Sequence, residues 1–336
     1  MMKFKSILFI LLTITFFSCD NEVDINEPGQ EITIVYGLLN QSETRHYVKI
    51  TKAFLVDGNV YAGAIDSEKS EYKPDELEVY IDEFTPNSFY QRIVLDTVLV
   101  ENKDSGAFYY PNQILWATPE NTILNKNNTY KLTIINKNSG AEITATTSLV
   151  GEISVAKPVD YQKVVNYTGN LPMEIEWRSA ENGKLYQVVI RFFYTERSSA
   201  GIMSVKYVDL PLSVHRSSST NGGGKITEEF YGASFYQNLK AKIPNPDNGA
   251  IRYPDSLHYI FWAADETFTI YMDVNKPTTG VVTEKPAFTN IENGLGLFAG
   301  RYTKIRSLEG LTPVSIDTLI DGQYTHHLGF QKYPNP

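Results

Sequence analysis

Apolar and polar residues alternate in short stretches along most of the chain, and this period of two is typical of β-strands with one buried face. Three of the clearest stretches are EITIVYGLL at 31–39, ELEVYIDEF at 76–84 and LYQVVIRFFYTE at 185–196. Further strands are predicted at 45–56, 91–100, 107–116, 129–135, 141–149, 173–178, 202–212, 257–274 and 301–305, and residues 314–319 fit an edge strand. The pattern therefore predicts an all-β fold with antiparallel strands.

An extended stretch at 151–159, with Pro158 near its end, divides these strands into two sets. The first set predicts an N-terminal β-sandwich of immunoglobulin-like type at 31–156. The second set predicts a C-terminal β-domain at 157–336. There, Trp177 on one strand and Tyr186 at the start of the next resemble a fibronectin III-like sandwich. Because any β core buries Trp and Tyr, an ordinary sandwich core is the alternative explanation of these two residues.

One short helix is predicted in the second domain, at 230–243. Phe235, Leu239 and Ile243 recur there at four-residue steps, and Pro244 ends the pattern. We expect this helix to pack across an open end of the sandwich rather than to bind a ligand. The run RSSSTNGGG at 216–224 is expected to be an exposed loop, because strand patterns continue on both sides of it.

The chain begins with MMKFKSILFILLTITFFSC. Lys3 and Lys5 precede a mostly apolar run at 6–17, which has the length of a signal-peptide core and is shorter than the about 20 residues that a membrane-spanning helix needs. Small Ser18 then precedes Cys19. The layout resembles a bacterial lipoprotein signal, in which residues 1–18 are removed and Cys19 carries the acyl chains. An ordinary secretory signal that happens to contain a cysteine is the alternative.

Residues 19–30 are polar, acidic and carry Pro28 and Gly29, so they predict a flexible tether. Asp20, Glu22 and Asp24 also resemble the export signal of surface lipoproteins in Bacteroidota. A solvated linker explains these acidic residues equally well. The predicted location is therefore the outer membrane, with a lipid anchor at Cys19, and the sequence leaves open whether the protein faces the surface or the periplasm.

Charge and cysteine content exclude several kinds of partner and site. Loss of Lys3 and Lys5 with the signal takes the formal net charge from −9 to −11, which argues against nucleic acid and against electrostatic docking on anionic lipid. Cys19 is the only cysteine, so a lipidated chain has no thiol for a disulfide, a zinc site or a nucleophile. The membrane contact is then expected to depend on the acyl chains.

Three features together resemble a lipoprotein family of Bacteroidota, domain of unknown function 4249. They are the lipoprotein start at Cys19, the opening strand at 31–39 and the late segment NGLGLF at 293–298. The resemblance implies a SusC-like, TonB-dependent outer-membrane transporter as a possible partner, and it implies no known catalytic residues. The stretch after this late segment, which continues to residue 336, is longer than the resemblance leads us to expect.

No motif for catalysis, a metal or a cofactor was found. Gly294, Gly296 and Gly300 lack the following helix that a nucleotide-binding loop requires, so tight-turn glycines are the simpler interpretation. No two histidines have metal-site spacing, and Ser234 lacks the flanking glycines of a nucleophile elbow. Neighbouring acids such as Asp265 and Glu266 are common, and a glycosidase pair is defined by separation in space. We therefore predict no enzyme, no metal and no cofactor, and no ligand-binding residue can be assigned.

In three places an Asp is followed by a Ser or Thr and then by an apolar residue: at 96–98, 255–257 and 317–319. This triplet resembles the O-glycosylation acceptor site of Bacteroidota envelopes. The three triplets predict possible modification at Thr97, Ser256 and Thr318. Since roughly one such match is expected by chance in a chain of this composition, the three triplets alone do not establish the modification.

Three functions remain open. The first is a non-catalytic accessory or ligand-binding lipoprotein of a TonB-dependent uptake system, whose small-molecule or glycan ligand the sequence does not identify. The second is a free-standing glycan-binding or adhesive module in which Tyr109, Tyr110 and Trp116 form a stacking platform, against the alternative that these three residues are core. The third is an envelope hydrolase with an unrecognised pair of carboxylates.

Overall fold

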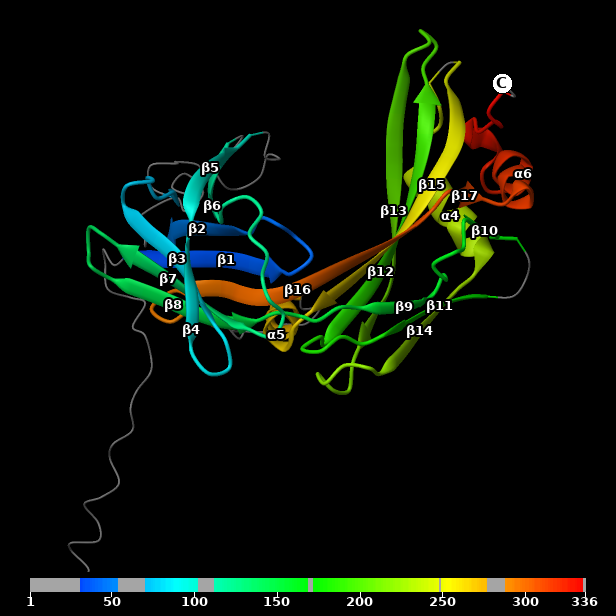
Figure 1. Ribbon diagram of the computed structural model, residues 1–336. Helices are drawn as coiled ribbons and strands as arrows, with labels where there is room; N and C mark the ends of the chain where they lie inside the picture. The colour runs from blue at the N-terminus through cyan, green and yellow to red at the C-terminus, as the bar shows by residue number, and fades with distance from the viewer. Residues whose placement is uncertain are drawn as a thin grey trace, which may run out of the picture.

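A sheet of eight strands runs through the whole molecule (Figure 1). The computed structural model describes residues 31–53, 70–101, 112–168, 172–247, 249–276 and 288–334. The predicted signal at 1–18 and the whole predicted tether at 19–30, with Cys19, lie outside these ranges. In spatial order the strands are β13 (Met203–Arg216), β12 (Leu185–Arg197), β15 (Ile251–Ala264), β16 (Leu295–Leu308), β1 (Ile32–Asn40), β2 (Tyr47–Ala53), β6 (Gln113–Ala117) and β5 (Asp96–Val100).

Smaller sheets pack against the two ends of this long sheet and make two sandwiches. The N-terminal one is closed by a sheet ordered β4 (Phe89–Val94), β3 (Leu77–Phe84), β7 (Thr129–Asn136) and β8 (Glu142–Ser148). The C-terminal one is closed by β14 (Lys225–Phe230), β11 (Met173–Arg178) and β9 (Ser154–Lys157), together with the pair β10 (Val164–Val165) and β17 (Gly310–Leu311). The all-β sandwich class predicted from the sequence is confirmed.

Each sandwich has its own hydrophobic core. In the N-terminal core, inward positions of β1 and β2 such as Val35 and Ile50 meet Ile81, Leu132 and other apolar residues of the four-stranded sheet. In the C-terminal core, Trp177 and Tyr186 are both buried, as a sandwich core requires. Burial of such side chains stabilises the fold by about 1.5–3 kcal/mol each.

The strand β16 belongs to both sandwiches and corrects the predicted division at 156/157. Its first half pairs in parallel with β1, from Ile34 opposite Leu295 to Asn40 opposite Arg301. Its second half pairs antiparallel with β15. Phe298 is therefore in the N-terminal core and Tyr302 in the C-terminal core. The N-terminal sandwich needs this late strand, so two contiguous ranges do not describe the domains.

The described residues contain three α-helices where one was predicted. The predicted one is present as α4 (Gly232–Lys242), with Phe235 and Leu239 fully buried. The strand predicted at 257–274 ends at Ala264, and α5 (Glu266–Val274) follows because Asp265 caps it. The predicted edge strand at 314–319 is instead α6 (Pro313–Asp321), which starts with Thr312 as N-cap and Pro313 in its first turn.

Two further differences concern the end of the chain and the stretch at 91–100. The stretch predicted as one strand forms β4 and β5 in two different sheets, because the chain turns into the N-terminal core at Leu95. The long tail is part of the fold. After the short 3₁₀ helix η1 (His326–Leu328), Phe330 enters the C-terminal core, where its ring meets Phe192 and Tyr194.

Candidate functional site

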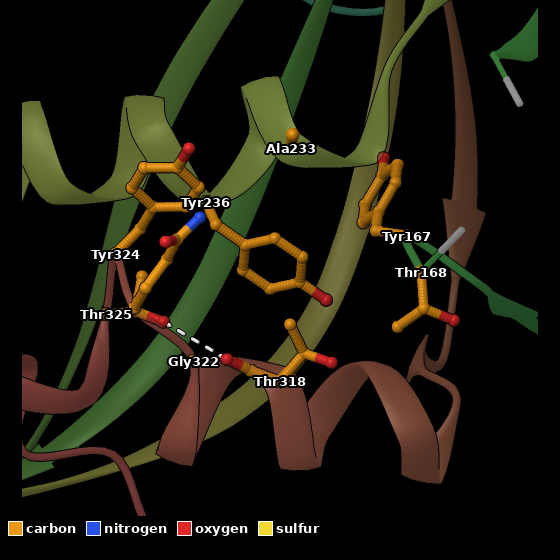
Figure 2. Close-up of a pocket in the computed structure, with 9 residues that line it drawn as sticks. Tyr167, Thr168, Ala233, Tyr236, Thr318, Gly322, Tyr324 and Thr325 are labelled. Carbon is orange, nitrogen blue, oxygen red and sulfur yellow. Dashed lines mark hydrogen bonds between the residues drawn. The ribbon is translucent and has the colours of Figure 1, made fainter. Parts of the chain in front are cut away.

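Two cavities lie at the end of the C-terminal sandwich, on either side of the segment that follows β10. The first is about 270 Å³ and lies between α4 and α6 (Figure 2). It is lined by Tyr167, Thr168, Ala233, Tyr236, Thr318, Gly322, Gln323, Tyr324 and Thr325. The second, about 430 Å³, is lined by Lys157, Pro158, Val159, Gln162, Val165, Asn166, Met173, Glu174, Ile175 and Tyr259.

Close packing at Gly232 sets the distance between α4 and the segment at 167–168. A Cβ at Gly232 would lie 2.0 Å from the carbonyl oxygen of Tyr167, so only glycine permits this approach. The backbone N–H of Tyr167 donates to Ser315 Oγ of α6 (2.8 Å), and the hydroxyl of Tyr236 donates to the Ser315 carbonyl (3.0 Å). One residue of α6 thus fixes both walls of the first cavity.

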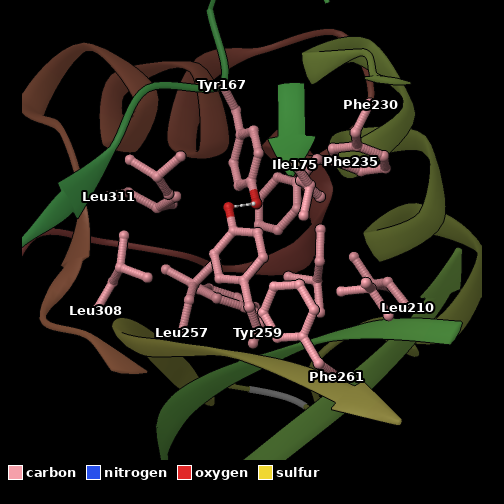
Figure 3. Packing of buried hydrophobic residues seen from close by; sticks show 14 of the residues in the cluster. Tyr167, Ile175, Leu210, Phe230, Phe235, Leu257, Tyr259, Phe261, Leu308 and Leu311 are labelled. Carbon is pink, nitrogen blue, oxygen red and sulfur yellow. Dashed lines mark hydrogen bonds between the residues drawn. The ribbon is translucent and has the colours of Figure 1, made fainter. Parts of the chain in front are cut away.

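A pair of buried tyrosines separates the two cavities. The hydroxyls of Tyr167, which lines the first cavity, and Tyr259, which lines the second, lie 2.6 Å apart (Figure 3). The ring of Tyr167 is stacked on Phe235 with 4.2 Å between ring centroids. Burial raises the pKa of both tyrosines, so both hydroxyls are neutral and can bond to one another.

The first cavity has no charged side chain in its lining. Several hydroxyl protons are already used: Tyr236 donates to Ser315, Thr318 to the Val314 carbonyl (2.9 Å) and Thr325 to the Thr318 carbonyl (3.4 Å). These oxygens keep lone pairs for a ligand's donors. The hydroxyl of Tyr324 accepts from Gln237 Nε2 (3.0 Å), so its own proton remains able to donate. Such a lining suits a small neutral ligand that carries hydroxyl groups.

The second cavity has a different rim. Lys157 and Glu174 form an ion pair there, and Gln162 and Asn166 add amides above an apolar base that includes Ile175. Both charged side chains are 40% exposed or more, so their pair contributes little to stability. The mixed rim gives no single ligand chemistry, and we assign no role to it.

A third cavity, about 290 Å³, lies where the two sandwiches meet and is lined by both Asp265 and Glu266. Asp265 is buried, which raises its pKa, and its two oxygens accept the backbone N–H groups of Phe268 (2.7 Å) and Gly300 (2.6 Å). The carboxylate therefore serves as the cap of α5. Glu266 is exposed. The geometry assigns no acid–base role to these two neighbours.

The structure places the predicted modification residues on three separate elements. Thr97 lies in β5, Ser256 in β15 and Thr318 in α6, and all three are half-buried. Of these, Thr318 lines the first cavity. Cys19 lies outside the described residues.

For Trp116 the structure favours the core interpretation over the stacking platform. Trp116 is only 2% exposed and belongs to the N-terminal core. Tyr109 and Tyr110 lie outside the described ranges.

Sequence reasoning did not find the residues that line the first cavity. They come from four places in the chain, and their only signal was the amphipathic pattern of α4, which predicted a cover over the open end of the sandwich. Across the described part of the chain, no three or more His, Cys, Asp or Glu side chains gather as a metal site. In the same ranges, no helix combines the length and apolar character needed to span a membrane.

Comparison with known proteins gives limited information. No family model and no curated protein matches the chain. Among solved structures, it is similar to the C-terminal globular domain of an oligosaccharyltransferase from Pyrococcus abyssi, with 11% sequence identity, a TM-score of 0.25 and 66% of this chain covered. The match spans 45% of that structure's length. At this TM-score the likeness carries no argument about function.

Proposed function

We propose that this chain is a lipid-anchored outer-membrane lipoprotein that acts as a non-catalytic, ligand-binding accessory component of a TonB-dependent nutrient uptake system. The N-terminal sequence supports the anchor at Cys19, and the resemblance to domain of unknown function 4249 supports a SusC-like transporter as partner. The observation that carries the binding role is the first cavity, whose lining combines tyrosine rings and hydroxyls without a charged group.

The chemistry of this cavity favours a neutral, hydroxylated ligand about the size of one sugar ring. A charged ligand would lose its hydration and gain no counter-charge from the lining. A sugar hydroxyl can donate to the lone pairs left on Thr318 and Tyr236, and a sugar ring can lie against the aromatic side chains. At about 270 Å³ the cavity is slightly smaller than the about 300–1,000 Å³ of sites for drug-sized ligands, which limits it to a ligand about the size of a single ring.

Binding is tested by calorimetry of the purified chain with a panel of neutral mono- and disaccharides, and with amino acids and organic acids as charged comparisons. Ala233 is exposed at the mouth of the cavity on α4, so Ala233→Trp should fill the opening and abolish binding without unfolding the helix. The matched control is Ala241→Trp, on the same helix and also exposed, which should bind normally. Equal loss in both variants, or no binding by any neutral sugar, would overturn the role of this cavity.

The accessory role is tested by a pull-down of tagged native protein from detergent-solubilised outer membrane. Stoichiometric recovery of one TonB-dependent transporter is the expected result. Recovery of the protein alone, together with sugar binding in calorimetry, would favour the free-standing glycan-binding module instead. Cys19→Ala should release the protein from the membrane fraction if the anchor is a lipid on this cysteine.

A further inference from the structure

The strand β13 forms one edge of the eight-stranded sheet and pairs, within the described residues, only with β12. In Figure 1 the end of this hairpin rises beyond the body of the C-terminal sandwich. An edge strand presents every second backbone N–H and C=O group to its surroundings, which makes it a template for another strand. Near its far end this edge approaches Glu228, which accepts from the backbone of Ser213, so the open part is the beginning of β13.

The open part of β13 carries a row of exposed apolar side chains. Every second residue of a strand lies on the same face, so Met203, Val205 and Tyr207 share one face of β13. They are 51%, 69% and 56% exposed. The neighbouring strand β12 holds Tyr207 in place: the Arg191 guanidinium lies 4.2 Å from the centroid of the Tyr207 ring, and the ring of Phe193 packs with 5.9 Å between centroids. The row is therefore apolar, and its Tyr207 ring is already oriented, which lowers the entropic cost of binding at that residue.

We propose that a second copy of this chain pairs with β13 in antiparallel orientation, with the two-fold axis at Val205. This register places Val205 opposite Val205, Met203 opposite Tyr207 and Ser204 opposite Lys206. Two apolar–aromatic pairs and one apolar pair then lie on one face, and no like charges are opposed.

Neighbouring registers are less favourable for the same residues. An axis at Lys206 sets two lysines opposite one another. An axis at Tyr207 sets Val205 opposite Asp209, and an axis at Ser204 sets Lys206 opposite Ile202. Of these four axes, only the one at Val205 sets Met203, Val205 and Tyr207 all opposite apolar or aromatic residues and sets Lys206 opposite a polar, uncharged residue. This self-complementarity is the reason to choose a second copy over an unrelated strand as the occupant.

The pairing is expected to be weak in dilute solution, because a ladder of five residues from each copy buries less surface than a stable interface needs. A membrane-anchored protein experiences a high local concentration, so a weak contact is sufficient there. The sufficiency of a weak contact rests on the lipid anchor of the proposed function, whereas the register at Val205 depends on neither the anchor, the ligand nor the transporter.

The test is sedimentation equilibrium of the purified full chain over a wide concentration range. The wild type should show a reversible monomer–dimer equilibrium. Val205→Lys and Val205→Glu should each weaken self-association by about tenfold or more, because like charges meet at the axis, and an equimolar mixture of the two should restore it. Restoration in the mixture is specific to a register in which residue 205 faces its own copy.

The matched control is Leu99→Lys, which places the same charge on β5, the opposite edge strand of the same sheet, at a residue that is 60% exposed. It should leave the equilibrium unchanged. A monomer at all concentrations, loss of the dimer in Leu99→Lys, or no restoration in the mixture would each overturn the proposal. The variants' circular dichroism should equal that of the wild type, since residue 205 is on the surface.

Discussion

The carboxylate of Asp265 accepts the backbone N–H of Gly300 across 2.6 Å, and this bond joins the first turn of α5 to the strand that both sandwiches share. The same oxygen accepts from the hydroxyl of Thr147 (3.3 Å), which lies near the end of β8 in the N-terminal sandwich. One buried side chain thus connects three elements at the point where the two sandwiches meet.

Replacing Asp265 by Ala should destabilise the protein by about 2–4 kcal/mol, because α5 loses its N-cap and the buried N–H of Gly300 loses its acceptor. Urea unfolding followed by fluorescence measures this change. Glu266→Ala is the control, since Glu266 is exposed in the same turn and should cost only a few tenths of a kcal/mol. Equal costs in the two variants would contradict the bridging role of Asp265.

Arg252 holds the C-terminal tail against β15. Its Nε donates to Glu196 (2.8 Å), and one terminal nitrogen donates to the carbonyls of Pro244 (2.8 Å) and Leu328 (2.9 Å), with the side chain only 3% exposed. Arg252→Met should cost about 3–5 kcal/mol, because Glu196 and two carbonyls lose a buried partner. Phe330 should then become accessible to chymotrypsin.

The control for Arg252 is Lys206→Met. Lys206 pairs with the same Glu196, but its side chain is 46% exposed, so its loss should cost less than about 1 kcal/mol and leave Phe330 protected. If both variants exposed the tail equally, the buried contacts of Arg252 would not be what holds it.

Much of this fold could be predicted from local pattern. The strands β1, β3, β7, β8, β11, β12 and β13 and the helix α4 lie where periodicity placed them. The alternation is clearest in β12, where buried and half-buried positions follow one another along most of the strand. The helices α5 and α6 were missed although their start signals are present: Asp265 before Glu266, and Thr312 before Pro313. Apolar content outweighed capping residues in the prediction, and capping would have been the better guide.

Pairing between distant segments could not be predicted in the same way. The parallel pairing of β1 with β16 joins residues more than 250 positions apart, and nothing in either stretch specifies the other. The first cavity has the same origin, since Tyr167, Tyr236 and Thr318 meet only when α4 and α6 pack on one sandwich. Sequence pattern describes which face of an element is buried, and it does not describe which other element covers that face.

His46 should make stability depend on pH. It is 1% exposed, its Nε2 lies 3.2 Å from the Thr122 carbonyl and its Nδ1 has no partner, and burial lowers its pKa. Below about pH 6.5 the unfolded chain binds a proton that the folded chain resists, so stability falls with acidification by up to about 1.4 kcal/mol per pH unit from this group.

The measurement is urea unfolding of the wild type and of His46→Gln at several pH values between about 7.5 and 5. This range includes the pKa of about 6.5 that histidine has in an unfolded chain. Gln can still donate to Thr122 but cannot be protonated, so its curve should be flatter than that of the wild type over this window. Parallel curves would show that His46 does not titrate differently in the folded and unfolded chain.

Gly296 permits the closest approach in the shared strand. Its φ is +117°, and a Cβ at this position would lie 2.0 Å from the carbonyl oxygen of Val35 on β1. At nearby Gly294, an added Cβ would lie 2.8 Å from the Thr33 carbonyl oxygen. These glycines therefore do more than form a tight turn: they let β16 lie directly beside β1, and the N-terminal core receives Phe298 as a result.

Gly296→Ala should consequently separate β16 from β1 and lower the free energy of unfolding. Gly223→Ala is the matched control, because Gly223 also has a positive φ, of +76°, but has open space where a Cβ would be. In both variants the strained backbone conformation lowers the free energy of unfolding by about 1–2 kcal/mol, and only in Gly296→Ala does the clash lower it further. We expect its cost to exceed the control by at least about 2 kcal/mol, with faster amide hydrogen exchange along β1. Equal costs, or unchanged exchange in β1, would mean that the two strands can separate slightly without loss, and that close packing at Gly296 does not hold the shared strand in place.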